Sequence, residues 1–184
     1  TVALSGDGGD EAFGGYDIYW RLARIAQMQH FPAVMWEASA WALDRLAKLT
    51  VLPAYLPARF RAIAQGDDAQ VVQGLFTSVQ EEELRGLCLD YQKMLPIRRL
   101  FEQQWEHCLP RKADRVERLS ALATEVNVRM MLANDFLFKV DLASMKESLE
   151  VRVPMLDEEL FSFGLSLPHR LKVKGRECKQ VLRK

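Results

Sequence analysis

The chain has no excess of either charge, because 25 Lys and Arg residues balance 25 Asp and Glu residues over 184 positions. Proteins that bind nucleic acid or anionic membranes electrostatically are usually basic, so the composition favours neither partner. The sequence also lacks an uncharged apolar run of about twenty residues, the length that crosses a bilayer. We therefore expect neither a nucleic acid nor a membrane among its partners.

Cysteine and histidine are scarce. The three cysteines are widely spaced and form no CxxC pair, which excludes a disulfide framework and a zinc site (Cys88, Cys108 and Cys178). The three histidines lack metal-ligand spacing, and we predict no role for them (His30, His107 and His169). Free thiols are typical of a reducing compartment, so we expect a cytoplasmic protein.

The common nucleotide and calcium motifs are also missing from the glycine-rich stretch LSGDGGDEAFGGY, residues 4–16. No GK[ST] follows, which excludes a Walker A loop. Glu11 occupies the place of the third glycine of a dinucleotide fingerprint, and Gly9 occupies a ligand position of an EF-hand. The stretch therefore needs another explanation.

What is present there is a short apolar segment, TVALS, followed by glycines and by carboxylates at Asp7, Asp10 and Glu11. The pattern predicts a strand, a tight turn and the start of a helix. Two interpretations remain open. The carboxylates are stabilised by the dipole at a helix N-terminus, or they hold Mg²⁺ while the glycines let a polyphosphate approach the backbone.

The rest of the chain has helical periodicity, so we predict a mainly α fold with one strand and about eight to ten helices. A lone strand cannot form a sheet, and TVALS is expected to pair with a second copy or with strands encoded upstream. The predicted helices cover about 10–29, 33–49, 58–65, a segment capped by Asp67 or Asp68, one with a Ser78–Glu81 capping box, 95–107, and 113–138 with a re-phasing near 133–134.

The helix over 33–49 is expected to bury an apolar face, whose members are Val34, Trp41, Leu43, Leu46 and Leu49. Pro53 and Pro57 are expected to mark the connector that follows it.

A second informative stretch is KVDLASMKESLEVRVPMLD, residues 139–157. Its charges suit a solvated helix face with pairs along the helix. Arg152 stands between two valines, however, and a partly buried arginine needs a carboxylate, for which Glu150 and Asp157 are the candidates.

A third stretch is the basic KVKGRECKQVLRK, residues 172–184. It is typical of a basic helix start. A lysine in it could also neutralise phosphate charge.

Together these stretches resemble the synthetase domain of the glutamine-dependent asparagine synthetase family. That family has an LSGxGxDExFGGY element, matched by residues 4–16, a KvDraSMaxsLEvRvPflD element, matched by residues 139–157, and a terminal KxxLR, matched by residues 179–183. The resemblance implies that residues 1–184 are the C-terminal part of an α/β adenine-nucleotide hydrolase-like domain of the PP-loop type.

The resemblance also implies the chemistry. In the family, ATP and Mg²⁺ activate the side-chain carboxylate of aspartate as an acyl-adenylate with release of pyrophosphate. Ammonia derived from glutamine in a separate N-terminal glutaminase domain then displaces AMP. Two alternatives stay open, namely a related amidotransferase that acts on another carboxylate and a non-catalytic helical interaction module.

Residue roles follow from the same motifs. Asp10 falls on the carboxylate for Mg²⁺ and pyrophosphate, and Lys179 on the lysine that stabilises phosphate charge. Asp7 falls on a position tied to the ammonia step that is commonly Glu, so its shorter side chain leaves the acceptor open. The predicted substrate- and nucleotide-binding residues are Ser5, Gly6, Gly8, Glu150 and Arg152.

Two parts of the family pattern are missing from these 184 residues, the Ser-Gly-Gly-x-Asp-Ser nucleotide loop and the glutaminase domain with its N-terminal cysteine. Thr1 is not an initiator methionine, and TVALS begins as though a strand had been cut. We therefore expect a fragment of a longer synthetase that lacks most of its ATP site and is inactive alone, with a homodimer as a candidate assembly.

Overall fold

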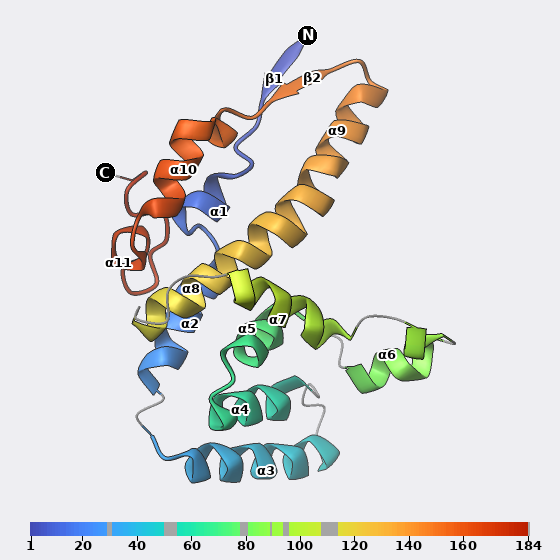
Figure 1. Cartoon of the computed structure of the whole chain (residues 1–184), viewed down its shortest axis with the longest axis vertical. Coiled ribbons are helices and arrows are strands. Elements are labelled where there is room, and N and C mark those ends of the chain that lie inside the picture. The colour runs from blue at the N-terminus through green and yellow to red at the C-terminus, as the bar shows by residue number, and fades with distance from the viewer. Residues whose placement is uncertain are drawn as a thin grey trace. The chain divides into compact units, whose positions relative to one another are not determined.

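The computed structural model describes residues 1–28, 31–49, 55–77, 81–88, 90–93, 96–107 and 114–183. The chain forms two units (Figure 1). Unit 1 comprises Thr1–Ala23 and Leu109–Lys184, and unit 2 comprises Arg24–Cys108. The described ranges contain eleven α-helices, slightly more than the eight to ten expected, with short 3₁₀ and π segments and two strands.

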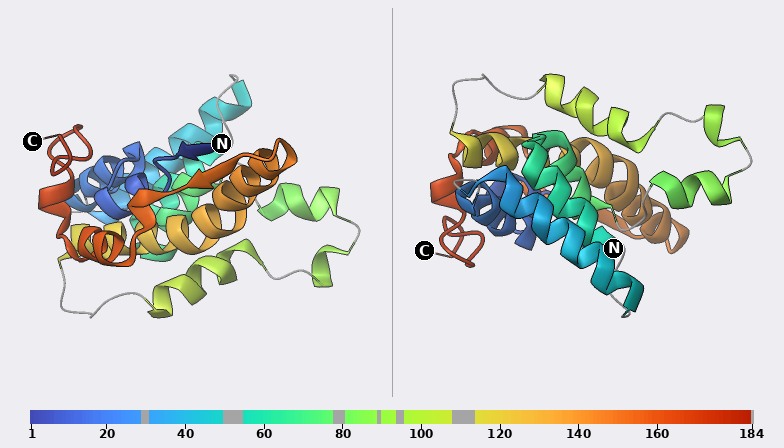
Figure 2. Two further views of the ribbon diagram at one scale, coloured as in Figure 1. Left: turned by 90° about the horizontal axis from the view of Figure 1, so that it is seen from above. Right: turned by 90° about the horizontal axis from the view of Figure 1, so that it is seen from below.

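The two strands of unit 1 lie side by side, although most of the chain separates them in sequence (Figures 1 and 2). Strand β1 (Val2–Leu4) pairs in parallel with β2 (Glu150–Arg152), in a register that sets Val2 opposite Glu150 and Leu4 opposite Arg152. The prediction of a single strand was therefore wrong. A three-residue strand is too short to show its alternation, and its partner is fixed by the tertiary fold.

The opening glycine region breaks into two helices where one was predicted. Helix α1 (Gly9–Phe13) ends at Gly14, whose φ of 67° is left-handed, and α2 (Asp17–Met28) follows. Glycine adopts this conformation without a Cβ clash, so the first helix stops there. The predicted end near residue 29 lies outside the described residues.

A long helical rod forms the centre of unit 1, drawn yellow to orange in Figure 1. It comprises α8 (Arg115–Val126), the π-helical segment η2 (Asn127–Phe136) and α9 (Leu137–Lys146). The wider π turn changes the phase of the side chains, which confirms the re-phasing predicted near residues 133–134. The buried apolar face of α8 consists of Leu119, Leu122, Ala123 and Val126.

The C-terminal part of unit 1 folds back onto α1. The 3₁₀ turn η3 (Pro154–Leu156) leads into α10 (Glu158–Ser166), whose first turn is capped by the carboxylate of Asp157. Gly164 of α10 packs so closely on α1 that a Cβ there would lie 2.8 Å from the Cβ of Ala12. The last helix is α11 (His169–Lys172), and a tight loop follows it.

Unit 2 consists of helices only over its described residues. Their bounds are α3 (Ala33–Leu49), α4 (Tyr55–Gln65), α5 (Asp68–Phe76), α6 (Glu81–Leu87), the 3₁₀ turn η1 (Tyr91–Lys93) and α7 (Ile97–His107). Helix α4 packs on α3 and on α5, and α5 packs on α7.

Helix α3 has the predicted bounds but not the predicted buried face. Val34, Trp41 and Leu46 are 71%, 62% and 47% exposed. The buried residues are Trp36 and Ala40, because the side of α3 that meets α4 carries them. The ring centroid of Trp36 lies 5.7 Å from that of Phe60 on α4. Both faces of α3 have apolar residues at helical spacing, and the packing of α4 determines which of them is buried.

Three local predictions can also be compared with the structure. The cap at Asp67 is confirmed, since its carboxylate accepts a hydrogen bond from the backbone N–H of Gln70 at 3.1 Å. Helix α4 starts three residues before the predicted bound, with Pro57 in its first turn, where proline loses no helical hydrogen bond. Ser78 and Pro53 lie outside the described residues.

None of the helices that the structure describes combines the length and the apolar character that a bilayer crossing requires. Cys88 and Cys178 are free thiols, and Cys108 lies outside the described ranges.

Candidate functional site

The loop after β1 is shaped by a glycine. The backbone N–H of Ser5 donates to the carbonyl oxygen of Arg152 at 2.9 Å and extends the β1–β2 ladder by one bond. Gly8 then turns the chain with a φ of 86°, and a Cβ there would lie 2.2 Å from Cδ2 of Leu156. Apart from its two chain neighbours, Gly6 has no atom within 4 Å of where its Cβ would be. The loop therefore needs glycine at position 8, and it is open at position 6.

Ser5 and Asp7, both predicted site residues, meet within this loop. The Ser5 hydroxyl donates to Oδ2 of Asp7 at 2.6 Å. Both residues are partly buried. The hydrogen bond holds the Asp7 carboxylate against the loop.

Asp10 and Lys179 form the central ion pair of the site. Lys179 Nζ lies 3.1 Å from Oδ1 of Asp10, and the two side chains are 32% and 36% exposed, respectively. Asp10 stands in the first turn of α1, while Lys179 follows α11 in the C-terminal loop. Two predicted residues separated by most of the chain thus meet, one anionic and one cationic.

The C-terminal loop is held against the corner between α1 and α2. The thiol of Cys178 donates to the carbonyl oxygen of Tyr16 at 3.6 Å, and burial raises the pKa of that thiol. The guanidinium of Arg176 lies 5.4 Å from the ring centroid of Trp20. These contacts hold the chain just before Lys179 against that corner.

A buried hydrogen bond lies beside the ion pair, between Glu11, one of the three carboxylates that could have held Mg²⁺, and Tyr16, for which no role was predicted. Glu11 is only 1% exposed and accepts a hydrogen bond from the Tyr16 hydroxyl at 2.7 Å. Burial is the larger cause and this bond to the carboxylate the next, and together they raise the pKa of Tyr16 far above its ordinary value. Both residues lie in the glycine-rich stretch 4–16, which could have pointed to them. The local sequence does not show, however, which of its carboxylates is buried.

Tyr19, three residues after Tyr16, is bonded to the central rod. Its hydroxyl accepts hydrogen bonds from Asn127 Nδ2 at 3.2 Å and from the Thr124 hydroxyl at 3.3 Å. Burial raises the pKa of Tyr19 to about 12. Buried polar groups that are paired in this way allow little displacement, so α2 is tied to α8 and to the start of η2.

Glu150 and Arg152 pair with each other on β2. Arg152 Nε donates to Oε1 of Glu150 at 2.7 Å, so Glu150, one of the two candidate partners, is the carboxylate that it meets. The expected partial burial of Arg152 was wrong, because its side chain is 65% exposed. A three-residue strand with one neighbour leaves its outward side chains uncovered. The β1–β2 register brings the Arg152 backbone to Ser5, while its side chain pairs along its own strand.

A second buried polar cluster anchors α11. Ser120 and His169 Nδ1 are 2.7 Å apart, and the backbone N–H of His169 donates to the Glu117 carboxylate at 2.9 Å. Burial lowers the pKa of His169. Burial also lowers the pKa of Lys172, to about 8, and its ammonium donates to the Leu165 carbonyl at 3.3 Å. No role was predicted for His169, and its contacts are those of a packed core histidine.

The predicted residues thus come together as three separate pairs, Ser5 with Asp7, Asp10 with Lys179, and Glu150 with Arg152. Among the residues that the structure describes, no group of three or more His, Cys, Asp or Glu side chains could hold a metal ion. A protein cage for a metal is therefore not formed in these ranges, and Asp10 is a single carboxylate opposite a cation.

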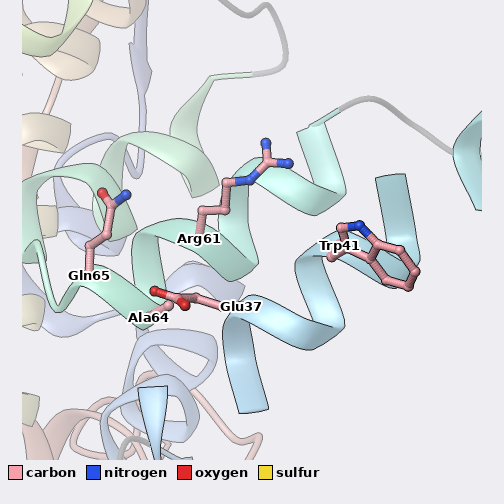
Figure 3. A pocket seen from close by; sticks show the side chains of 5 residues that line it. All are labelled: Glu37, Trp41, Arg61, Ala64 and Gln65. Carbon is pink, nitrogen blue, oxygen red and sulfur yellow. The ribbon is translucent and has the colours of Figure 1, made fainter. Parts of the chain in front are cut away.

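Unit 2 has a pocket of its own, with a volume of about 270 Å³. Figure 3 shows its lining side chains projecting from α3 and α4: Glu37, Trp41, Arg61, Ala64 and Gln65. Arg61 pairs with Asp44 of α3. None of the predicted site residues lines this pocket.

Comparison with known proteins gives a consistent result. The chain is 27% identical over 189 residues to glutamine-hydrolysing asparagine synthetase 1 of Bacillus subtilis (strain 168), with all of this chain and 27% of that protein covered. It is 28% identical over 196 residues to a Mycobacterium bovis (strain ATCC BAA-935 / AF2122/97) protein provisionally named glutamine-hydrolysing asparagine synthetase, again with the whole chain and 26% of the relative covered.

The chain therefore spans about a quarter of the length of these curated relatives. No solved structure matches it at a significant level. The sequence profile of the family described as asparagine synthase matches residues 1–184, the full length of the chain. This chain belongs to the asparagine synthase family.

Proposed function

We propose that this chain is part of an ATP-dependent, glutamine-dependent asparagine synthetase and carries half of its adenylation site. The observation that carries the proposal is the 3.1 Å pair between Asp10 and Lys179. Few structural reasons favour such a pair, because a partly exposed ion pair contributes about 1 kcal/mol or less to stability. A carboxylate and an ammonium side by side suit a metal–polyphosphate ligand, whose two charges they complement.

The donor set fits Mg²⁺ bound together with a phosphate. Mg²⁺ is commonly held by one or two carboxylates, with its other positions taken by water and phosphate oxygens. Asp10 would supply the carboxylate, and Lys179 would neutralise the phosphate charge. When bound, Mg²⁺ would polarise the phosphate that leaves. The space beside Gly6, where no neighbour lies within 4 Å, leaves room for a substrate next to the loop.

The chemistry explains why such charges are needed. A carboxylate is a poor electrophile until one of its oxygens becomes a good leaving group. The aspartate oxygen bonds to the α-phosphorus of ATP and pyrophosphate leaves; ammonia then bonds to the acyl carbon, and AMP leaves while nitrogen loses a proton. Lys179 stabilises the charge that develops on phosphate, which is where fixed cations contribute most.

The other predicted residues would act on the acceptor side. Ser5 holds Asp7 by the 2.6 Å hydrogen bond, which would place the carboxylate for the ammonia step. Glu150 and Arg152 extend from the strand next to this loop and would contact the substrate. Ammonia would come from a glutaminase domain of the complete protein.

A related amidotransferase that acts on another carboxylate is the second candidate. The observation that favours it is at Asp7, whose side chain is short and is tied back by Ser5. A shorter, restrained acid would leave space for an acceptor that differs from aspartate.

Both candidates are tested by pyrophosphate release from the complete natural protein, with glutamine, ATP and either aspartate or other carboxylates as acceptors. Asp10→Asn and Lys179→Ala are each expected to lower the rate at least about a hundredfold, since fixed charges at such centres contribute that much. Lys174→Ala, which changes an exposed lysine of the same loop, is the matched control and should leave the rate unchanged. Equal rates in all three variants would overturn the site, and preference for another acceptor would favour the second candidate.

A further inference from the structure

Gly15 adjoins the ion pair, yet its backbone does not require glycine. The glycines with left-handed φ in the described residues are Gly8, Gly14, Gly66 and Gly175, and Gly15 is not one of them. A residue with a side chain could therefore adopt the Gly15 backbone without strain. The reason for glycine at this position has to come from its neighbours.

Those neighbours are the two charged side chains themselves. A Cβ at Gly15 would lie 1.6 Å from Oδ1 of Asp10 and 2.5 Å from Cε of Lys179. Both contacts are far shorter than any two nonbonded atoms tolerate. The volume in which the carboxylate and the ammonium meet is thus the volume that a side chain at Gly15 would fill.

The backbones that carry the two charges are held in place, so only a rotation of the side chains can relieve such a clash, and that rotation moves the two charges out of their present pairing. Asp10 stands in α1, and its carbonyl accepts the backbone N–H of Gly15 at 2.8 Å. Lys179 has a left-handed φ of 55°, a conformation that non-glycine residues adopt only when the surroundings impose it. Its carbonyl accepts from the backbone N–H of Leu182 at 3.0 Å, and the thiol of the preceding Cys178 is bonded to Tyr16.

We propose that Gly15 is a positioning residue for the Asp10–Lys179 pair, because its missing side chain reserves the space in which the two charges meet. The expected effect of Gly15 on the reaction rate rests on the proposed function. Its effect on the packing of Asp10 and Lys179 does not. Gly15 acts through the pair and makes no bond to a substrate. Any side chain at this position separates the carboxylate from the ammonium.

The test is a double-mutant cycle in the complete natural protein, with Gly15→Ala, Lys179→Ala and the double variant. Gly15→Ala alone should lower the pyrophosphate-release rate about a hundredfold, as displacement of a catalytic group by about 1 Å does. It should also lower the thermal midpoint by about 5 °C through overpacking. In the Lys179→Ala background the same change should have a much smaller effect on the midpoint, since Cε is gone and the Asp10 carboxylate is free to rotate.

Gly86→Ala is the matched control, because nothing lies within 4 Å of that Cβ and the site of substitution is in α6. It should change neither rate nor midpoint appreciably. The inference would be overturned if Gly15→Ala shifts the thermal midpoint equally with and without the Lys179 side chain. It would also be overturned if Gly15→Ala keeps the full pyrophosphate-release rate while Lys179→Ala lowers it. If Lys179→Ala keeps the full rate, the proposed function fails. The thermal midpoints of the double-mutant cycle still show whether Gly15 reserves space for the pair.

Discussion

The two units bury different kinds of residue. Five of the six polar or charged residues that are buried in the described ranges belong to unit 1, namely Glu11, Ser120, Asn127, His169 and Lys172. In the described part of unit 2 Asp68 is the sixth, and the other buried side chains there are apolar, for example Trp36, Val72 and Phe101. Apolar burial is not directional, whereas a buried polar group stabilises a fold only with its partner at a fixed geometry. Unit 1 is therefore the part built to hold particular atoms in place.

This difference matches the position of the candidate site. All eight predicted site residues lie in unit 1. Glu11 of α1 accepts a hydrogen bond from Tyr16, Tyr19 of α2 accepts one from the central rod, and the backbone N–H of His169 of α11 donates one to the rod. The pocket of unit 2 is lined by α3 and α4 and has one carboxylate and one guanidinium. Three predictions would break or sharpen the comparison.

The largest effect on stability is expected when a buried leucine of unit 1 is replaced, and it is compared with the replacement of an exposed leucine in unit 2. Leu122 on α8 is fully buried, while Leu46 on α3 is 47% exposed. Leu122→Ala should lower the free energy of unfolding by about 2–5 kcal/mol, because it leaves a cavity in a packed core. Leu46→Ala, the matched control, should cost about 1 kcal/mol or less. Denaturant titrations measure both, and similar costs would show that α3 buries the face that its sequence predicts.

A smaller effect is expected at the buried hydrogen bond of unit 1. Tyr16→Phe removes the hydroxyl that donates to the Glu11 carboxylate, and the loss should be about 1–3 kcal/mol of unfolding free energy. Replacing both partners, as in Glu11→Met with Tyr16→Phe, should recover part of this loss, since no charge is then left buried. If Tyr16→Phe costs under about 0.5 kcal/mol, the hydrogen bond does not stabilise unit 1.

The smallest effect is a dependence on pH at Lys172, whose pKa is lowered to about 8 by burial from an ordinary value of 10.5. Between these values the unfolded chain binds more protons than the folded one, so stability should rise with pH in this window. The gain should be about 1 kcal/mol between pH 7 and 9. Lys172→Met lacks the titrating group, and its advantage over the natural protein in thermal midpoint should shrink as pH rises. A constant difference would contradict the burial.

Local signals predicted a good part of the fold. The bounds of α3, the Asp67 cap and the re-phased helix before residue 139 all follow from neighbours a few positions apart. Predictions failed where strand pairing or burial depends on a segment that is distant in sequence. The second strand, the buried face of α3 and the exposure of Arg152 each depend on what packs against the element.

The sequence by itself determined the family, because three separated motifs match that family in order, and it determined which residue types could bind metal and phosphate. Only the tertiary structure decided that Asp10 meets Lys179, that Glu11 is buried with a hydrogen bond from Tyr16, and that Gly15 leaves room for the pair. The physical reason is that motif spacing encodes local geometry, whereas a contact between the first and last tenths of the chain arises from the packing of everything between them.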